Sequence, residues 1–119
     1  MFIGKVIGTV WATKKTENLK NLRFLLIQPV DVETEATKAI IVAADPIGAG
    51  PGEMVVVAFG RAARLAVGDE NVSIEAAVIG IVDAVEVDDK FTRGVETFDL
   101  LRQELIKAGL RKEKQDDGD

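Results

Sequence analysis

The sequence predicts a mainly β protein in which five strands form a small, strongly curved sheet or a closed barrel, with one short helical turn and an added C-terminal α-helix. Three observations lead to this fold class. Segments rich in Val and Ile alternate with short polar or glycine-bearing connections. Glycines lie inside the first of these segments, and a closing sheet needs sharp bends. Only the region beyond about residue 95 carries apolar residues at a clear helical spacing.

The five predicted strands follow one another through short connections. Their ranges are 2–13, 22–30, 39–45, 53–60 and 74–87. In the first strand, Gly4 and Gly8 indicate a bend, a bulge or a close backbone approach. Pro29 is expected to end the regular pairing of the second, because proline has no backbone N–H to donate. Residues 61–73 have room for one short helical turn and a polar loop.

Two of these strands are apolar on both faces. The runs "VVVAF" (55–59) and "AAVIGIV" (76–82) show no alternation of apolar and polar residues. In a small antiparallel barrel one face is normally polar. Either these strands are central or another subunit covers their outer faces. We favour subunit contacts, because so much apolar surface is a liability on a monomer.

A segment at about residues 95–108 has the spacing of an amphipathic helix. Its apolar face is formed by Phe98, Leu101, Leu105 and Ala108. Gly109 is the expected C-cap. The simplest interpretation is that this face packs on its own barrel or on a neighbouring subunit. The alternative hypothesis is a docking helix for another protein, such as an enclosed cargo, with Phe98, Leu101 and Leu105 in the contact.

This change in character divides the chain of 119 residues. Residues 1–90 form the predicted barrel domain, and residues 91–119 form a C-terminal extension of helix and charged tail. The tail beyond the helix, which ends in "EKQDDGD", is predicted to be disordered because it is almost entirely charged or polar.

The residue inventory excludes most catalytic and metal-binding chemistry. The chain has no Cys, His or Tyr, so it lacks disulfides, thiolate zinc ligands and histidine acid–base catalysis. Ser73 is the only serine and has no histidine to activate it. We therefore predict no enzyme activity, no cofactor and no metal. Glu53, Glu75 and Asp83 are candidates for a carboxylate-dependent enzyme, but solvent-exposed or turn-stabilising roles fit them better.

Charge and hydropathy argue against nucleic-acid and membrane partners. Fifteen Lys and Arg against twenty Asp and Glu give a net charge of −5. Nonspecific nucleic-acid binding depends on cation–phosphate contacts, which such a chain supplies poorly. The longest apolar runs fall far short of the roughly 20 residues that span a bilayer. The N-terminus has no signal-peptide pattern, so a cytoplasmic location is expected.

The glycine-rich stretch "DPIGAGPGE" (45–53) is the most distinctive motif. A dinucleotide fingerprint needs its third glycine where Glu53 stands, and a helix after it, whereas "MVVVAF" follows here. A phosphate-binding P-loop needs Gly-Lys before Ser or Thr, which is absent. The stretch is therefore predicted to be a rigid turn between strands, with Asp45 before Pro46 as the turn initiator. Its glycines serve positive φ or a close chain approach.

Several stretches in consistent order resemble the EutN/CcmL family, the pentameric vertex proteins of bacterial microcompartment shells. The stretch "GKVIGTVWATKKTENLKNLRFLLIQPVD" is similar to the family's first two strands. The stretch "AADPIGAGPGEMVVVAFGRAAR" is similar to its central segment, and "SIEAAVIGIVDAVEV" to its last barrel strand. The resemblance covers roughly residues 1–90. It departs from the family pattern at Arg61, where relatives usually carry a small residue, and it does not explain the extension.

The resemblance implies an OB-like barrel that assembles as a homopentamer. Such pentamers cap the five-fold corners of a shell built otherwise from hexameric and trimeric tiles, in the bacterial cytoplasm. It also implies that Gly48, Ala49 and Gly50 lie at or near subunit contacts or the five-fold axis. Arg64 matches the family arginine, which is expected to form a charge-assisted bond across the interface.

Two alternatives from other functional classes remain. An OB-fold module that binds single-stranded nucleic acid would need stacking aromatics and basic grooves, whereas the chain has one Trp, five Phe and an acidic balance. A small carboxylate-dependent enzyme would need a deep pocket that gathers several acidic groups.

Overall fold

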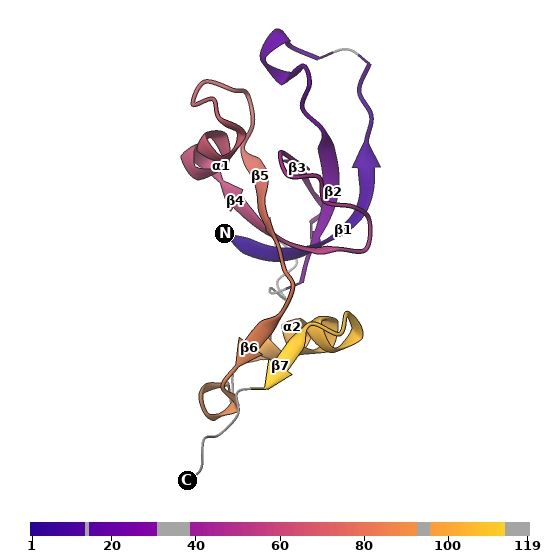
Figure 1. The fold of residues 1–119 in the computed structure, drawn as a ribbon, viewed down its shortest axis with the longest axis vertical. Coiled ribbons are helices and arrows are strands. Elements are labelled where there is room, and N and C mark those ends of the chain that lie inside the picture. The colour runs from indigo at the N-terminus through magenta and orange to yellow at the C-terminus, as the bar shows by residue number, and fades with distance from the viewer. Residues whose placement is uncertain (14, 31–38, 93–95, 114–119) are drawn as a thin grey trace.

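In the computed structural model, which describes residues 1–13, 15–30, 39–92 and 96–113, five strands close into a barrel (Figure 1). The strands are β1 (Phe2–Val10), β2 (Phe24–Pro29), β3 (Ile41–Ala44), β4 (Met54–Phe59) and β5 (Ala76–Ile81). Their order around the barrel is β1-β2-β3-β5-β4, and the pairing of β1 with β4 closes it. The predicted fold class is confirmed.

One strand pairing is parallel, which the sequence analysis did not predict. Ala44 of β3 is paired with Ala77 of β5 in a parallel ladder, whereas all other pairings in the barrel are antiparallel. The chain reaches β5 only after β4 and the helix α1 (Gly60–Val67). That helical crossover returns β5 in the direction of β3, as parallel pairing requires.

The helix α1 is longer than the single turn predicted. Gly68 caps it with a φ of 91°, and its N–H donates to the carbonyls of Arg64 and Leu65. Its buried residue, Ala63, packs against Ala44 and Ala77. These small side chains let the helix lie close to the barrel wall where β3 and β5 pair.

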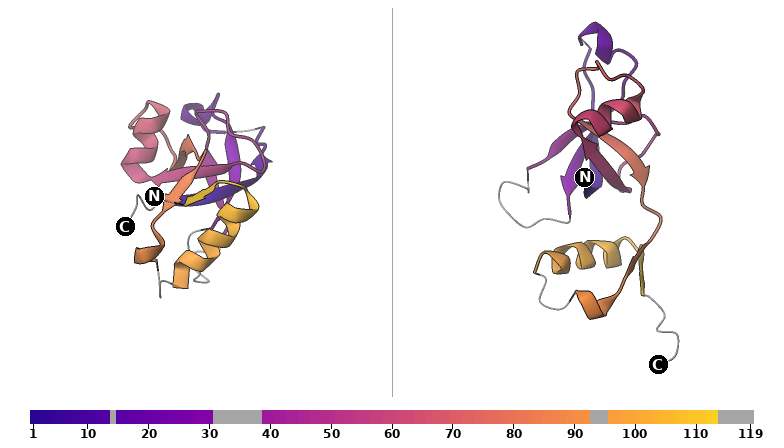
Figure 2. Two further views of the ribbon diagram at one scale, coloured as in Figure 1. Left: turned by 60° about the horizontal axis from the view of Figure 1, so that its bottom comes forward. Right: turned by 90° about the vertical axis from the view of Figure 1, so that its left-hand side faces the viewer.

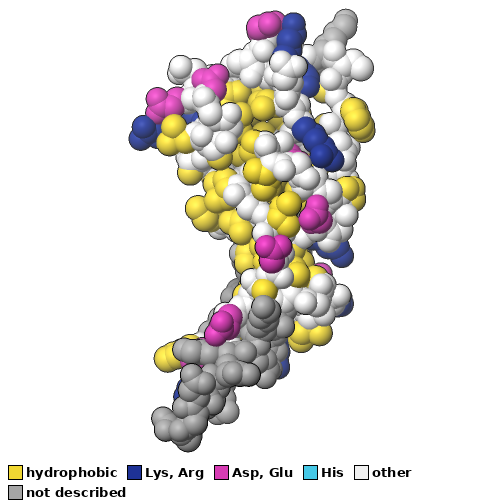
Figure 3. Space-filling model, viewed as in Figure 1, with side chains coloured by type: hydrophobic (Ala, Val, Ile, Leu, Met, Phe, Trp, Pro, Cys, Tyr) yellow, Lys and Arg dark blue, Asp and Glu magenta, His cyan; other side chains and the backbone are white. Residues whose placement is uncertain are grey.

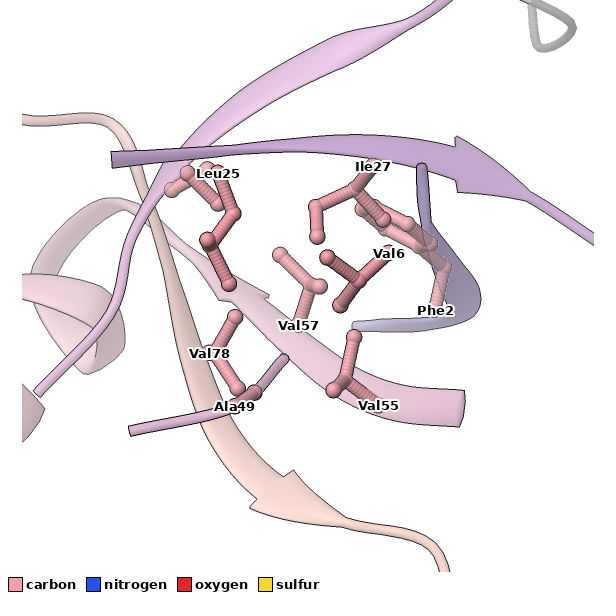
Figure 4. Close-up of a cluster of buried hydrophobic side chains, with 10 residues drawn as sticks. Phe2, Val6, Leu25, Ile27, Ala49, Val55, Val57 and Val78 are labelled. Carbon is pink, nitrogen blue, oxygen red and sulfur yellow. The ribbon is translucent and has the colours of Figure 1, made fainter. Parts of the chain in front are cut away.

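The core of the barrel is filled by aliphatic side chains that point inward from all five strands (Figure 4). The fully buried members with the largest side chains are Leu25, Ile27, Val6, Val55, Val57 and Val78. Inward and outward residues alternate along each strand, so the apolar runs that looked uniform in sequence have one face in this core.

The glycines of the first strand have the roles that the sequence indicated. A Cβ added at Gly4 would collide with the side chain of Ile27 and lie 2.9 Å from the ring of Phe2. Gly8 sits where the register between β1 and β2 shifts after Val6. Gly4 thus allows a close approach across the barrel, and Gly8 follows a bulge that increases the curvature of β1.

The fifth predicted strand is divided in two. The range 74–87 was predicted as one strand, but β5 ends at Ile81 and a separate strand, β6 (Val85–Val87), follows. β6 leaves the barrel and pairs in parallel with β7 (Arg111–Glu113) in a second, two-stranded sheet. The division follows from closure, because β5 is already paired on both edges and the chain runs past the end of the barrel.

The predicted C-terminal helix is present as α2 (Glu96–Lys107). Gly109 is its C-cap as predicted, with a φ of 69°, and the N–H of Leu110 donates to the carbonyl of Leu105 at 2.9 Å. The disorder predicted for the whole tail is wrong for Arg111–Glu113. The turn at Gly109 reverses the chain and brings these residues beside β6 as strand β7.

The second sheet and α2 project from one end of the barrel (Figure 2). The described part of the chain is accordingly long and narrow, with extents of 58 × 29 × 23 Å. Two short 3-10 helices, Glu17–Leu19 and Asp89–Phe91, lie in the connections. The division of the chain at residue 90 stays a prediction; strand pairing groups Val85–Val87 with the extension.

Substituting Gly4 by Ala is expected to destabilise the barrel by about 1–3 kcal/mol, because the new methyl group overpacks the core against Ile27 and Phe2. The free energy of unfolding in urea measures this. Gly8→Ala is the matched control, since its Cβ would meet Leu26 only at an ordinary contact distance of 3.4 Å. Equal losses in the two variants would show that Gly4 is not a close-approach position.

Candidate functional site

The glycine loop between β3 and β4 is held by two carboxylates of its own chain. Asp45 is buried at the end of β3, and its Oδ1 accepts hydrogen bonds from the N–H groups of Ile47 (3.2 Å) and Gly48 (2.9 Å). Glu53 Oε1 accepts a hydrogen bond from the N–H of Gly50 at 2.6 Å. The predicted turn-initiating role of Asp45 is confirmed, and Glu53 stabilises the same turn from its far end.

A buried charge fixes the entry to this loop. The side chain of Asp45 is fully buried, and Nη1 of Arg23 lies 3.6 Å from its Oδ2. The backbone N–H of Asp45 also donates to the carbonyl of Arg23 at 2.8 Å. A buried carboxylate is costly unless a cation and hydrogen-bond donors compensate it. The loop is therefore tied to the residue that precedes β2.

This arrangement does not suit a phosphate-binding loop. Such a loop presents free backbone N–H groups to its anion. Here three N–H groups already donate to carboxylates, and those carboxylates would repel an anion. Gly48 and Gly52 have φ of 88° and 89°, so they are needed for the left-handed backbone of the turn.

The three loop residues predicted at a subunit contact differ in exposure. Gly48 is exposed and Gly50 is half-buried, whereas Ala49 is fully buried. Ala49 belongs to the barrel core, beside Val78 (Figure 4). Their contact role stays a prediction. The side chain of Ala49 is packed in the core of its own barrel. A subunit contact at this loop would therefore involve the exposed backbone at Gly48.

Arg64 lies on α1 with most of its side chain covered. Its Nη1 is 3.6 Å from Oε2 of Glu75, which is too long for a hydrogen bond, and the side chain of Glu75 is exposed. Arg61, on the same helix, is exposed and pairs with exposed Glu70 at 2.8 Å. Of the two arginines of α1, Arg64 is therefore the one without a close ion pair in the described part of the chain, whereas Arg61 has one.

One apolar face, called face A here, lies on the outside of β1, β4 and β5. Ile3, Val56 and Gly80 occupy neighbouring register positions on these strands. Ile79 stands beside them and is 36% exposed. Hydrophobic side chains gather over the middle of the barrel on the side where β4 and β5 cross (Figure 3).

A second apolar face, called face B here, lies on the outside of β1, β2 and β3. Leu26 and Val42 are paired in register, and Val42 is 51% exposed. Ile7, at the bulge of β1, is 46% exposed. In the barrel order, β4 and β2 are separated by β1 on one side and by β5 and β3 on the other. Faces A and B therefore look in different directions.

Sequence reasoning identified the apolar strands but not these two faces. The run "VVVAF" indicated that β4 has an apolar outer face, and Val56 provides it. Face B lacked such a signal, since Ile7, Leu26 and Val42 each stand in a different strand and the sequence does not show which side of the strand they occupy. Only the register of a closed barrel brings them together.

The carboxylates considered for catalysis do not form a site. Glu53 is committed to the glycine loop, Glu75 lies opposite Arg64, and Asp83 is exposed after β5. Within the described ranges no group of three or more acidic side chains is positioned to hold a metal ion. Over the same ranges, no helix has the length and apolar character to cross a bilayer.

The residues proposed for the docking helix have different surroundings. Leu105 is fully buried and Leu101 is half-buried, so part of the apolar face is covered within the chain. Ala108 follows α2 and is exposed. The side chain of Phe98 lies outside the described part of the structure. Docking of this helix to another protein stays a prediction.

Comparison with known proteins gives a consistent result. Residues 1–83 match the family model described as "Ethanolamine utilisation protein EutN/carboxysome". The shell vertex protein GrpN of Rhodospirillum rubrum is 42% identical over 86 residues, which are 72% of this chain and 97% of GrpN. The carboxysome shell vertex protein CcmL of Gloeobacter violaceus is 41% identical over 90 residues, 76% of this chain and 90% of CcmL.

Solved structures agree with the sequence matches. The pentameric microcompartment shell protein GrpN of Rhodospirillum rubrum superposes with a TM-score of 0.61 at 41% identity, over 73% of this chain and 99% of that structure. The structure of Gloeobacter violaceus CcmL gives a TM-score of 0.63 at 41% identity, over 73% and 90% of the two chains. The family match ends at residue 83, before β6 and α2.

Replacing Glu53 by Ala should destabilise the fold by about 1–3 kcal/mol, because the N–H of Gly50 loses a charged acceptor. Glu53→Gln is the control, since its amide oxygen can accept the same hydrogen bond. Urea unfolding of the two variants and the natural chain measures the difference. An alanine variant as stable as the natural chain would contradict the role given to Glu53.

Proposed function

The chain belongs to the EutN/CcmL family, and on this premise we propose that it is a structural shell protein whose pentamers cap the five-fold vertices of a bacterial microcompartment. Its location is then the bacterial cytoplasm, within the shell. Its partners are four further copies of itself and the hexameric and trimeric tiles around the vertex. The mechanism is geometric: wedge-shaped subunits close around an axis and introduce curvature that a flat layer of tiles lacks.

The observation that carries this proposal is the pair of apolar faces on the barrel. A ring with cyclic symmetry needs a heterologous interface, in which two different patches of each subunit meet. Faces A and B are two such patches, and they look in different directions around the barrel. Face A of one subunit packs against face B of the next. Burial of Ile79 and Val42 there removes apolar surface that water would otherwise contact.

Arg64 supplies a polar contact in the same interface. Its side chain is mostly covered, and its pairing with Glu75 in the described part of the chain is longer than a hydrogen bond. An arginine fork can therefore accept a further partner, such as a carboxylate or carbonyl of the next subunit. The exposed pair of Arg61 and Glu70 is already close and needs no such partner.

The two other functional classes have less support. Among the described aromatic side chains, Trp11 and Phe91 are exposed on different segments, and Phe2 and Phe59 contact each other, so these four form no stacking platform. The chain has a net charge of −5, which opposes phosphate binding. The proposed function is structural and includes no catalysis, in keeping with the separate surroundings of the candidate carboxylates.

Placing a charge on either apolar face should abolish the pentamer. Ile79→Glu on face A and Val42→Glu on face B would each bury an unpaired carboxylate in the interface, which is costly. Native mass spectrometry over a range of concentrations should show a five-subunit species for the natural chain and monomers for each variant. Gln103→Glu, at an exposed position of α2, is the matched control and should stay pentameric.

Mixing the two face variants tests the heterologous geometry. Ile79→Glu retains face B and Val42→Glu retains face A, so the mixture should form dimers of one copy of each and no larger ring. Thermal unfolding checks that both variants remain folded. Dimers of a single variant would contradict the proposed geometry, because they would require a face to pack against itself. A monomeric natural chain would contradict the proposed function.

Arg64→Ala should raise the concentration at which half of the pentamers dissociate by about tenfold or more, which corresponds to about 1.1 kcal/mol per interface, because this concentration enters the dissociation constant to the fourth power and five interfaces are lost. Arg61→Ala, from the same helix, should leave this concentration unchanged, because an exposed ion pair contributes little. The measurement is again native mass spectrometry on dilution. Equal half-dissociation concentrations for the two variants would show that Arg64 makes no contact across the interface.

A further inference from the structure

The sheet formed by β6 and β7 is unusual because it is small, parallel and open on both edges. Each strand has three residues, and neither is paired with a further strand in the described part of the chain. Parallel sheets occur almost only where they are covered and extended by other elements. The helix α2 contacts β7, but both outer strand edges stay open in the described part of the chain. A further strand at these edges would pair the backbone groups that now face outward.

The barrel of the same chain does not supply that partner. Every edge of the barrel is used by its closure, and the extension projects beyond its end (Figures 1 and 2). The half-buried Val85 and Val87 flank the exposed Glu86. Since no described strand of this chain pairs with the outer edge of β6 or β7, another molecule is the candidate partner.

We propose that the free edge of β6 pairs with the free edge of β7 from the neighbouring subunit of the pentamer. This inference rests on the proposed function, since it needs a ring of identical chains. The occupant of the edge is thus a second copy of this chain, held at a high effective concentration by the barrel interface.

The edge of β6 that faces away from β7 has backbone groups available for pairing with another strand. The N–H of Val85 donates to the carbonyl of Leu110 at 2.8 Å, toward β7. Successive residues of a strand direct their backbone groups to opposite edges. The N–H and C=O of Glu86 are therefore directed to the open edge, where a neighbouring strand would meet them.

Residue types favour β7 as the partner. β6 reads Val-Glu-Val and is followed by two aspartates, whereas β7 reads Arg-Lys-Glu and is followed by lysine. Within the chain, Glu86 is opposite Lys112 in the parallel register. Pairing β6 with the neighbour's β7 repeats this opposite-charge pair. Pairing β6 with another β6 would place glutamate near glutamate, which is destabilising.

Symmetry gives the same answer. A rotation about an axis keeps strands that run along the axis parallel, so a cyclic ring can repeat the parallel pairing from one subunit to the next. Like-to-like pairing of β6 would instead need a two-fold axis, which a five-fold ring lacks. With each β6 beside the next β7, ring closure leaves no open strand edge, which removes the liability of exposed edges.

The proposed edge is also continuous with face A. β6 follows β5 after only three residues, and β5 contributes Ile79 to face A. The subunit that covers face A is therefore placed to reach β6 as well. The pairing extends the barrel interface onto the segment that the family match does not include.

A cross-linking experiment can test this pairing because the natural chain has no cysteine. Chains carrying only Glu86→Cys are co-expressed with differently tagged chains carrying only Lys112→Cys. Pentamers that contain both tags are purified and oxidised. Since each chain has one cysteine, any disulfide must join two subunits. We expect a covalent dimer with both tags, and much less dimer from either variant alone.

Co-expression of the Glu86→Cys chain with a Gln103→Cys chain is the matched control and should give no specific cross-link. Mixed pentamers whose Glu86→Cys and Lys112→Cys chains cross-link no more than this control would overturn the inference while leaving the proposed function intact. Dominant cross-linking by Glu86→Cys alone would also overturn it. Absence of pentamers in the natural chain would overturn both.

A proline substitution provides an independent measurement. Glu86→Pro removes the N–H on the open edge and spares the N–H of Val85, which bonds to Leu110. The concentration for half-dissociation of the pentamer should rise by about tenfold or more, while thermal unfolding of the barrel is unchanged. An unchanged dissociation concentration would show that this edge carries no inter-subunit hydrogen bond.

Discussion

Closure of the five strands into one barrel is the constraint on which the rest of the structure depends. Pairing of β1 with β4 closes the barrel, so each barrel strand has a strand neighbour on both sides and offers little free edge for assembly. Contacts with other copies must then use the outer side chains. Closure also forces curvature, and the close approach at Gly4 and the bulge before Gly8 provide it.

The glycine loop shows how a short segment can be rigid without forming a ligand site. Its N–H groups donate to Asp45 and Glu53, and Ala49 inserts into the core. Arg23 lies 3.6 Å from the buried Oδ2 of Asp45 and offsets part of its charge. Three of the N–H groups that could bind an anion are used to fix the turn. The loop therefore positions β3 and β4 relative to each other, which suits a structural subunit.

Assembly also explains features that make little sense in a single chain. Ile79 and Val42 expose apolar surface on two sides of the barrel. A two-stranded parallel sheet extends from its end, and both of its outer strand edges are unpaired in the described part of the chain. In the proposed ring, the apolar surfaces at Ile79 and Val42 form one repeated interface. The two-stranded sheets of neighbouring subunits form one continuous set of paired strands. The same symmetry accounts for both, because each requires two different surfaces of one chain to meet.

The sequence by itself determined the fold class, the family and the absence of Cys, His and Tyr. These follow from local properties: residue composition, apolar runs, the turn signal at Asp45 and the C-cap at Gly109. The end of β5 at Ile81, the strand β7 and the parallel pairing of Ala44 with Ala77 were not predictable in this way. Each depends on which strands, distant in sequence, become neighbours when the chain folds. The tertiary structure likewise decided that Ala49 faces the core and that Leu26 and Val42 share an outer face, because only strand register brings residues distant in sequence onto one surface.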